Sequence, residues 1–154
     1  MFRALCILLF SLAASSPCLA QPSLIGTYKL LSNDLRLDGV PIQPMGKSQH
    51  GYLVITSKVV VQFFTADNRK PGATPEAKVA LFDSLSAWAG PYRLEGDKLI
   101  VDVDTAWTEV WSGKPQVRTY QVEGRRLTLI VAPQPSSTQP GKTLTSRSVW
   151  EKID

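Results

Sequence analysis

A short stretch in the second half of the chain holds the side chains best suited to binding a small molecule. Trp107 and Trp111 precede a run in which Gln116, Arg118 and Tyr120 occupy alternate positions. Alternate residues of a β-strand project from one face, so this run places a guanidinium beside an amide and a phenol. Such a trio can hold the acidic or carbonyl end of a ligand, while the tryptophans cover its apolar part.

A structural role for the same side chains is the simpler interpretation. If Val117 and Thr119 face the interior instead, Arg118 lies in solvent or stacks on a tryptophan. Trp88 and Tyr92 also share a strand face and can line a cavity. The two interpretations stay open, and the candidate ligand-binding residues are Tyr92, Trp107, Trp111, Gln116, Arg118 and Tyr120.

The sequence contains few residues arranged for catalysis or for metal binding. Glu109 lies between Trp107 and Trp111, and a carboxyl group buried among tryptophans would have a raised pKa and act as an acid. His50 is the single histidine. No serine or aspartate lies at a sequence spacing that indicates a catalytic partner for it. One histidine also leaves too few ligands for a zinc site. We assign no catalytic residue, no metal site and no cofactor.

The first twenty residues are expected to be a signal peptide. Arg3 precedes an apolar run over residues 4–14, and Ala20 provides the small residue of a cleavage site. The run is shorter than the ~20 apolar residues that a membrane-spanning helix needs. We therefore predict export to the periplasm or the medium, removal of residues 1–20, a single β-barrel domain over residues 21–154, and no membrane span after cleavage.

Cysteine usage and charge exclude further kinds of site. Cys6 and Cys18 are the two cysteines and both lie in the predicted signal peptide, so the exported domain is expected to lack disulfides and thiol chemistry. The chain has 17 Lys and Arg residues against 13 Asp and Glu residues. These basic residues are scattered, and Arg125-Arg126 is the single adjacent pair of arginines. Nucleic acid is therefore not an expected partner.

Period-two patterning indicates that β-strands position the candidate residues. The two residues between the β-branched and aromatic runs 51–56 and 59–65 predict a hairpin. Leu99, Val101 and Val103 alternate with aspartates, which predicts one buried and one solvated face. Eight strands are predicted, over residues 25–37, 51–56, 59–65, 88–94, 99–104, 117–122, 127–131 and 143–152.

One helix interrupts the strands. Thr74 is placed to cap a helix that begins at Pro75 and continues to about Leu85. Eight strands joined by short turns close most simply into a barrel, because closure pairs the two exposed edges. Such a barrel has an interior just wide enough for side chains or one small ligand. We predict an all-β, eight-stranded antiparallel up-and-down barrel with one short helix, and a two-sheet sandwich is the alternative.

Several short motifs follow one another in order along the chain. Gly26-Thr27-Tyr28 comes near the start and Val149-Trp150-Glu151 near the end, and the motifs between them cover residues 89–99, 103–107, 111–120 and 123–129. This series resembles the bacterial lipocalin-like domain family. The resemblance implies a lipocalin-like barrel, often without an assigned activity. The broader lipocalin family has Gly-x-Trp where this chain has Gly26-Thr27-Tyr28, so we transfer no known lipocalin ligand.

Three functions agree with these observations. The favoured one is an exported protein that binds a small apolar or amphipathic molecule, because the expected barrel has an aromatic-rich second half. The second is an accessory envelope protein with a solid barrel and a protein-binding surface. The third is a barrel enzyme, an isomerase, cyclase or lyase, that uses Glu109, Arg118 or Tyr120. The sequence identifies neither the ligand nor a protein partner.

Overall fold

The computed structural model describes residues 23–154, so the predicted signal peptide and both cysteines lie outside the described residues. Ten strands and one helix make up this part of the chain. The helix is α1 (Pro75–Asp83). The strands are β1 (Gly26–Leu37), β2 (Val40–Ile42), β3 (His50–Ile55), β4 (Val59–Thr65), β5 (Leu85–Glu95), β6 (Lys98–Asp102), β7 (Thr105–Ala106), β8 (Pro115–Glu123), β9 (Arg126–Pro135) and β10 (Thr143–Lys152).

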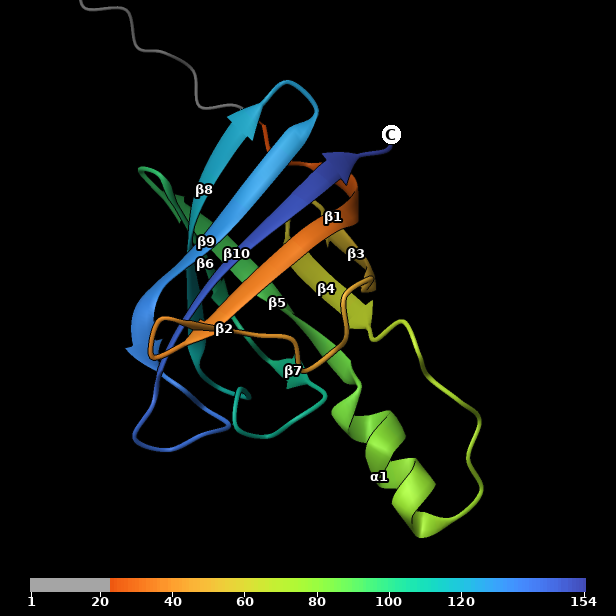
Figure 1. The fold of residues 1–154 in the computed structure, drawn as a ribbon. Helices are drawn as coiled ribbons and strands as arrows, with labels where there is room; N and C mark the ends of the chain where they lie inside the picture. Colours follow the sequence, from red (N-terminus) through yellow and green to blue (C-terminus); the bar gives the residue numbers. More distant parts are fainter. Residues whose placement is uncertain (1–22) are drawn as a thin grey trace, which may run out of the picture.

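Eight of the strands close into a barrel (Figure 1). Their order around it is β10-β9-β8-β6-β5-β4-β3-β1, and pairing of β1 with β10 completes the ring. All pairs are antiparallel. The short strands β2 and β7 pair with β1 and β5. The predicted eight-stranded barrel is therefore confirmed, and the two-sheet alternative is wrong.

The helix α1 stands apart from the barrel core. Thr74 caps it through its side-chain oxygen, as predicted, but it ends at Asp83 and Leu85 already belongs to β5. Val79 and Phe82 are exposed, and α1 has no buried residue. Figure 1 shows α1 projecting from the lower end of the barrel. Within residues 23–154, no helix combines the length and apolar character required to cross a membrane.

The Gly90-Pro91 step lies inside the sheet rather than at an edge. β5 pairs with β4 over Leu85–Pro91, while on its other side the partner changes from β6 to β7 around Gly90. A Cβ atom at Gly90 would collide with the backbone carbonyl of Asp102. Glycine therefore lets the two strands approach at the point where the pairing is irregular.

Packed side chains fill the end of the barrel that carries the β3–β4, β5–β6 and β8–β9 turns, the upper end in Figure 1. Trp150 is fully buried and pairs with Leu30 of β1. The Tyr28 hydroxyl donates to the Leu24 carbonyl at 2.8 Å. Because apolar packing and paired polar groups occupy the interior there, we call this region the closed end.

Candidate functional site

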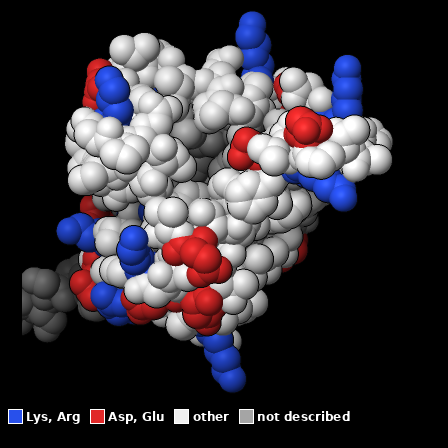
Figure 2. All heavy atoms as spheres, turned by 90° about the horizontal axis from the view of Figure 1, so that it is seen from below, with Lys and Arg blue, Asp and Glu red and all other residues white. Residues whose placement is uncertain are grey.

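A cavity of about 330 Å³ lies at the opposite end of the barrel, which we call the open end. Inward-facing residues of β1, β4, β5, β8, β9 and β10 form its walls, together with the loops after β2, β7 and β9. Figure 2 looks at the molecule from below and shows a hollow among mostly uncharged residues. The volume falls at the small end of the range for ligand pockets.

Apolar and aromatic side chains form much of the surface of the cavity wall. β1 contributes Leu35 and Leu37, β4 contributes Phe64, and β5 contributes Trp88. These side chains face inward because alternate residues of each strand point into the barrel. Fourteen of the twenty-five lining residues are polar, so the wall combines apolar surface with many hydrogen-bonding groups, which suits an amphipathic ligand.

Arg118 of β8 is the principal polar group on this wall. Its Nη1 donates to the Val117 carbonyl at 3.0 Å, and its Nη2 donates to Gln116 Oε1 at 3.2 Å. The guanidinium also lies over the Trp88 ring, 5.7 Å from the ring centroid. Gln116 and Arg118 face inward and line the cavity, whereas Val117 between them is exposed. The alternative with Val117 and Thr119 facing inward is therefore wrong.

No carboxylate in residues 23–154 forms an ion pair with Arg118. The side chain is half-buried, and desolvation lowers the pKa of its guanidinium to about 10. The group still carries its charge at neutral pH, because its pKa lies well above 7. A positive charge without an acidic partner thus projects into a largely apolar cavity, an arrangement that costs free energy until an anion compensates it.

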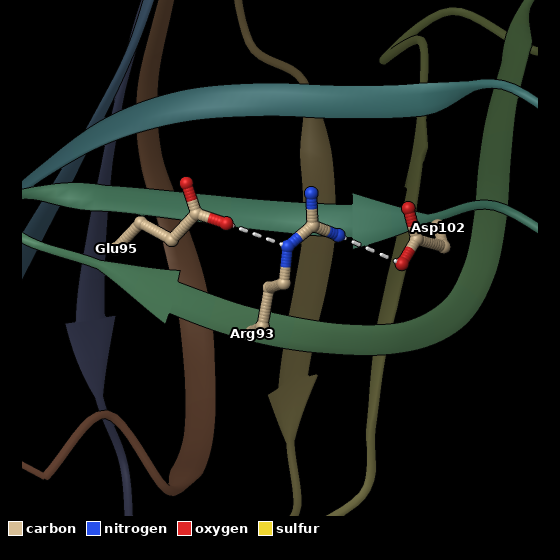
Figure 3. A network of polar contacts seen from close by, with 3 residues as sticks. All are labelled: Arg93, Glu95 and Asp102. Atoms are coloured by element: carbon tan, nitrogen blue, oxygen red, sulfur yellow. Dashed lines mark hydrogen bonds and ion pairs between the residues drawn. The ribbon is translucent and has the colours of Figure 1, made fainter.

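Arg93 shows how this protein treats an arginine on the outer face. Its Nε contacts Glu95 Oε1 at 2.8 Å and its Nη1 contacts Asp102 Oδ2 at 2.9 Å (Figure 3). The hydrogen bond to Glu95 and then that to Asp102 raise the pKa of Arg93. The half-exposed arginine has two carboxylate partners, whereas Arg118, inside the barrel, has none among the described residues.

Two tryptophans stand at the mouth of the cavity, beside α1. The Trp107 ring contacts Phe82 at 4.5 Å and meets the edge of Trp111 at 6.1 Å between centroids. Trp111 Nε1 donates to Ser137 Oγ at 3.0 Å. Trp107 Nε1 is buried and has no hydrogen-bond partner among the described residues. The mouth therefore holds one buried donor, the Trp107 indole N–H, that lacks an acceptor among the described residues.

The candidate residues named from the sequence divide between the two ends. Four of them line the cavity: Trp107, Trp111, Gln116 and Arg118. Tyr120 lies in the closed end, where its hydroxyl donates to the Gly96 carbonyl at 3.2 Å. Tyr92 packs against the same core, and its hydroxyl donates to the Thr56 carbonyl at 2.9 Å. The structure therefore brings four of the six together at one cavity.

The hypothesis of a buried acid is wrong. Glu109 is exposed, so the surroundings that would make it an acid among tryptophans are absent. His50 is exposed at the start of β3. Over residues 23–154, no group of three or more histidine, cysteine, aspartate or glutamate residues is arranged to hold a metal ion.

Sequence reasoning missed the half of the cavity wall that comes from the early strands and from β10. Gln62 and Ser86 are buried polar residues on this wall, and Ser146 and Ser148 line it from β10. The available signal was a polar residue at an inward position of a largely apolar strand. Gln62 between Val61 and Phe63 has that pattern.

Comparison with protein families agrees with this geometry. The family model of the lipocalin-like domain matches residues 25–153, nearly all of the described chain. The chain belongs to the lipocalin-like domain family. Neither the curated proteins nor the solved structures yield a match. In a lipocalin-like barrel of eight strands, the interior can accommodate one small ligand, and in this chain the free interior is the cavity at the open end.

Proposed function

We propose that this lipocalin-like domain binds one small amphipathic molecule in the cavity at the open end, and that it does so as an exported protein. The observation that carries the proposal is the cavity itself, about 330 Å³ in volume and lined by Phe64, Trp88 and the two tryptophans at its mouth. Apolar surface combined with hydrogen-bonding groups is the usual form of a small-molecule site. Export rests on the basic and apolar start of the sequence.

The structure also favours this proposal over the two other functions considered from the sequence, an accessory protein with a solid barrel and a barrel enzyme. An accessory protein with a solid barrel does not agree with free interior volume at the open end. The outer face of β4 exposes Val59, Val61 and Phe63, and we assign it no partner. An enzyme that uses Glu109 as a buried acid does not agree with the exposure of that side chain.

A titration with decan-1-ol tests the proposal, because the alcohol is amphipathic and uncharged. Trp88, Trp107 and Trp111 line the cavity, so a bound ligand is expected to change the intrinsic fluorescence in a saturable way. No saturable change, with no heat of binding by calorimetry, would overturn the proposed function.

The cavity is distinguished from the outer surface by a matched pair of variants on β10. Ser146 lines the cavity, whereas the next residue, Arg147, is exposed. Ser146→Phe places a ring in the cavity and is expected to weaken decan-1-ol binding by about tenfold or more, since the ring occupies the space that the ligand needs. Arg147→Phe places the same ring outside and should leave binding unchanged. Equal effects of the two variants would contradict binding in the cavity.

A further inference from the structure

We propose that the ligand is a singly charged anionic amphiphile whose carboxylate binds Arg118, an inference that rests on the proposed function. Arg118 lies on the cavity wall with no carboxylate partner in residues 23–154. A half-buried guanidinium without an acid is unfavourable, and pairing it with an anion offsets that cost. The cavity thus favours a ligand that brings the missing negative charge.

The free hydrogen-bond donors around Arg118 fit a carboxylate. A guanidinium has five N–H donors, and two of those on Arg118 already bond to protein oxygens, which leaves three for a ligand. Gln116 uses its oxygen to accept from Arg118, and its amide nitrogen has no partner among the described residues. Arg118 and Gln116 therefore supply donors without acceptors on this part of the wall. A carboxylate, which only accepts and can take two parallel bonds from an arginine, completes them.

The charged residues on the cavity wall favour a ligand that carries one negative charge. Among the described residues, Arg118 is the one Lys or Arg side chain that lines the cavity, and the other charged residue there is the exposed Asp83. One carboxylate neutralises one guanidinium. A phosphate monoester carries about −1.5 to −2 at neutral pH, which leaves excess negative charge in an apolar site. Carboxylates are therefore favoured over phosphate monoesters.

The arrangement of the wall also sets the orientation and size of the ligand. Arg118 rests on Trp88, next to the packed closed end, whereas Trp107 and Trp111 stand toward the mouth. The charged head is therefore expected at the floor, with the apolar tail toward the mouth. A volume of about 330 Å³ equals the share of roughly ten water molecules in the liquid. This space matches a medium-length chain such as that of decanoate.

Four ligands with the same ten-carbon chain test the inference by calorimetry on the wild-type protein at pH 7.5. Decanoate is expected to bind about ten- to a hundredfold more tightly than decan-1-ol, which is the usual gain from a hydrogen bond to a charged group. Decyl phosphate should bind more weakly than decanoate, and decyltrimethylammonium more weakly than decan-1-ol. This series needs no variant, so it decides the question even if a substitution prevents folding.

Two arginine variants then test whether Arg118 is the residue responsible for the preference for decanoate over decan-1-ol. Arg118→Met should abolish the preference for decanoate over decan-1-ol while decan-1-ol still binds, whereas Arg93→Gln on the outer face should keep the full preference. If wild-type protein binds decan-1-ol as tightly as decanoate, or if Arg118→Met keeps the preference, the inference is overturned and the proposed function stands. If neither ligand binds, the proposed function fails as well.

Discussion

The two ends of this barrel use the same strands for opposite purposes. At the closed end, apolar side chains pack around Trp150, and the polar tips of Tyr28 and Tyr120 each donate to a backbone carbonyl. At the open end, Arg118 has no carboxylate partner and Trp107 Nε1 has no acceptor among the described residues. At the closed end, these buried polar groups have hydrogen-bond partners within the protein. At the open end, some hydrogen-bond donors have no acceptor among the described residues.

β8 shows the contrast within one strand. Tyr120, Arg118 and Gln116 all face the interior and lie in turn from the closed end to the open end. Tyr120 is part of the packed core, while two residues away Arg118 borders free volume. Burial at one end stabilises the fold, and this stability allows an uncompensated charge at the other end, as is common where function requires a destabilising group.

Truncating one tryptophan at each end should give the largest difference. Trp150→Ala removes a fully buried ring from the closed end and is expected to lower the free energy of unfolding by about 3–5 kcal/mol. Trp107→Ala removes a partly buried ring that borders the cavity and should cost less than about 2 kcal/mol. Urea denaturation followed by circular dichroism measures both values. Equal losses would show that the two ends contribute alike to stability.

The pH dependence of decanoate binding should reverse sign between wild-type protein and Arg118→Met. In wild type the guanidinium lowers the pKa of the bound carboxyl group, so affinity is full above the pKa of the free acid, about 4–5, and falls as pH decreases through it. In Arg118→Met, burial without a cation raises the pKa of the bound acid, so affinity should rise as pH decreases.

Calorimetry between pH 7 and about 4 measures this dependence, with an expected change of about tenfold in each direction. Circular dichroism at each pH serves as the control for folding. Parallel pH profiles in the two proteins would contradict contact between the carboxylate and Arg118.

The barrel could be predicted from the sequence because its signals are local. Alternation of apolar and polar residues marks Leu99, Val101 and Val103 as inward-facing, and all three are buried. The two-residue break at Ser57-Lys58 predicts the β3–β4 hairpin, which the structure contains. Patterns of this kind report on the face of a strand and on its turns, which are properties of neighbouring residues.

The cavity could be predicted only in part, because alternation specifies the face of a residue and not its height in the barrel. Tyr92 and Tyr120 share the inward face with Trp88 and Arg118, but they lie nearer the closed end and pack in the core. Height depends on the tilt of the strands and on neighbours across the barrel, which are distant in sequence. For the same reason, the sequence did not identify Phe64 of β4 as a cavity residue, although the structure places it on the cavity wall.

Denaturation of ligand-free Arg118→Met tests most directly whether Arg118 is kept for a ligand. Desolvation lowers the pKa of the guanidinium to about 10, so holding its charge in the cavity wall without an acid is unfavourable. Arg118→Met removes this cost, but it also removes the stacking on Trp88 and two hydrogen bonds, whose contributions to stability are of comparable size. We therefore predict that the variant is as stable as wild type to within about 1 kcal/mol and no longer prefers decanoate. A variant that is less stable by about 1 kcal/mol or more would contradict this account, since Arg118 would then be a structural part of the barrel.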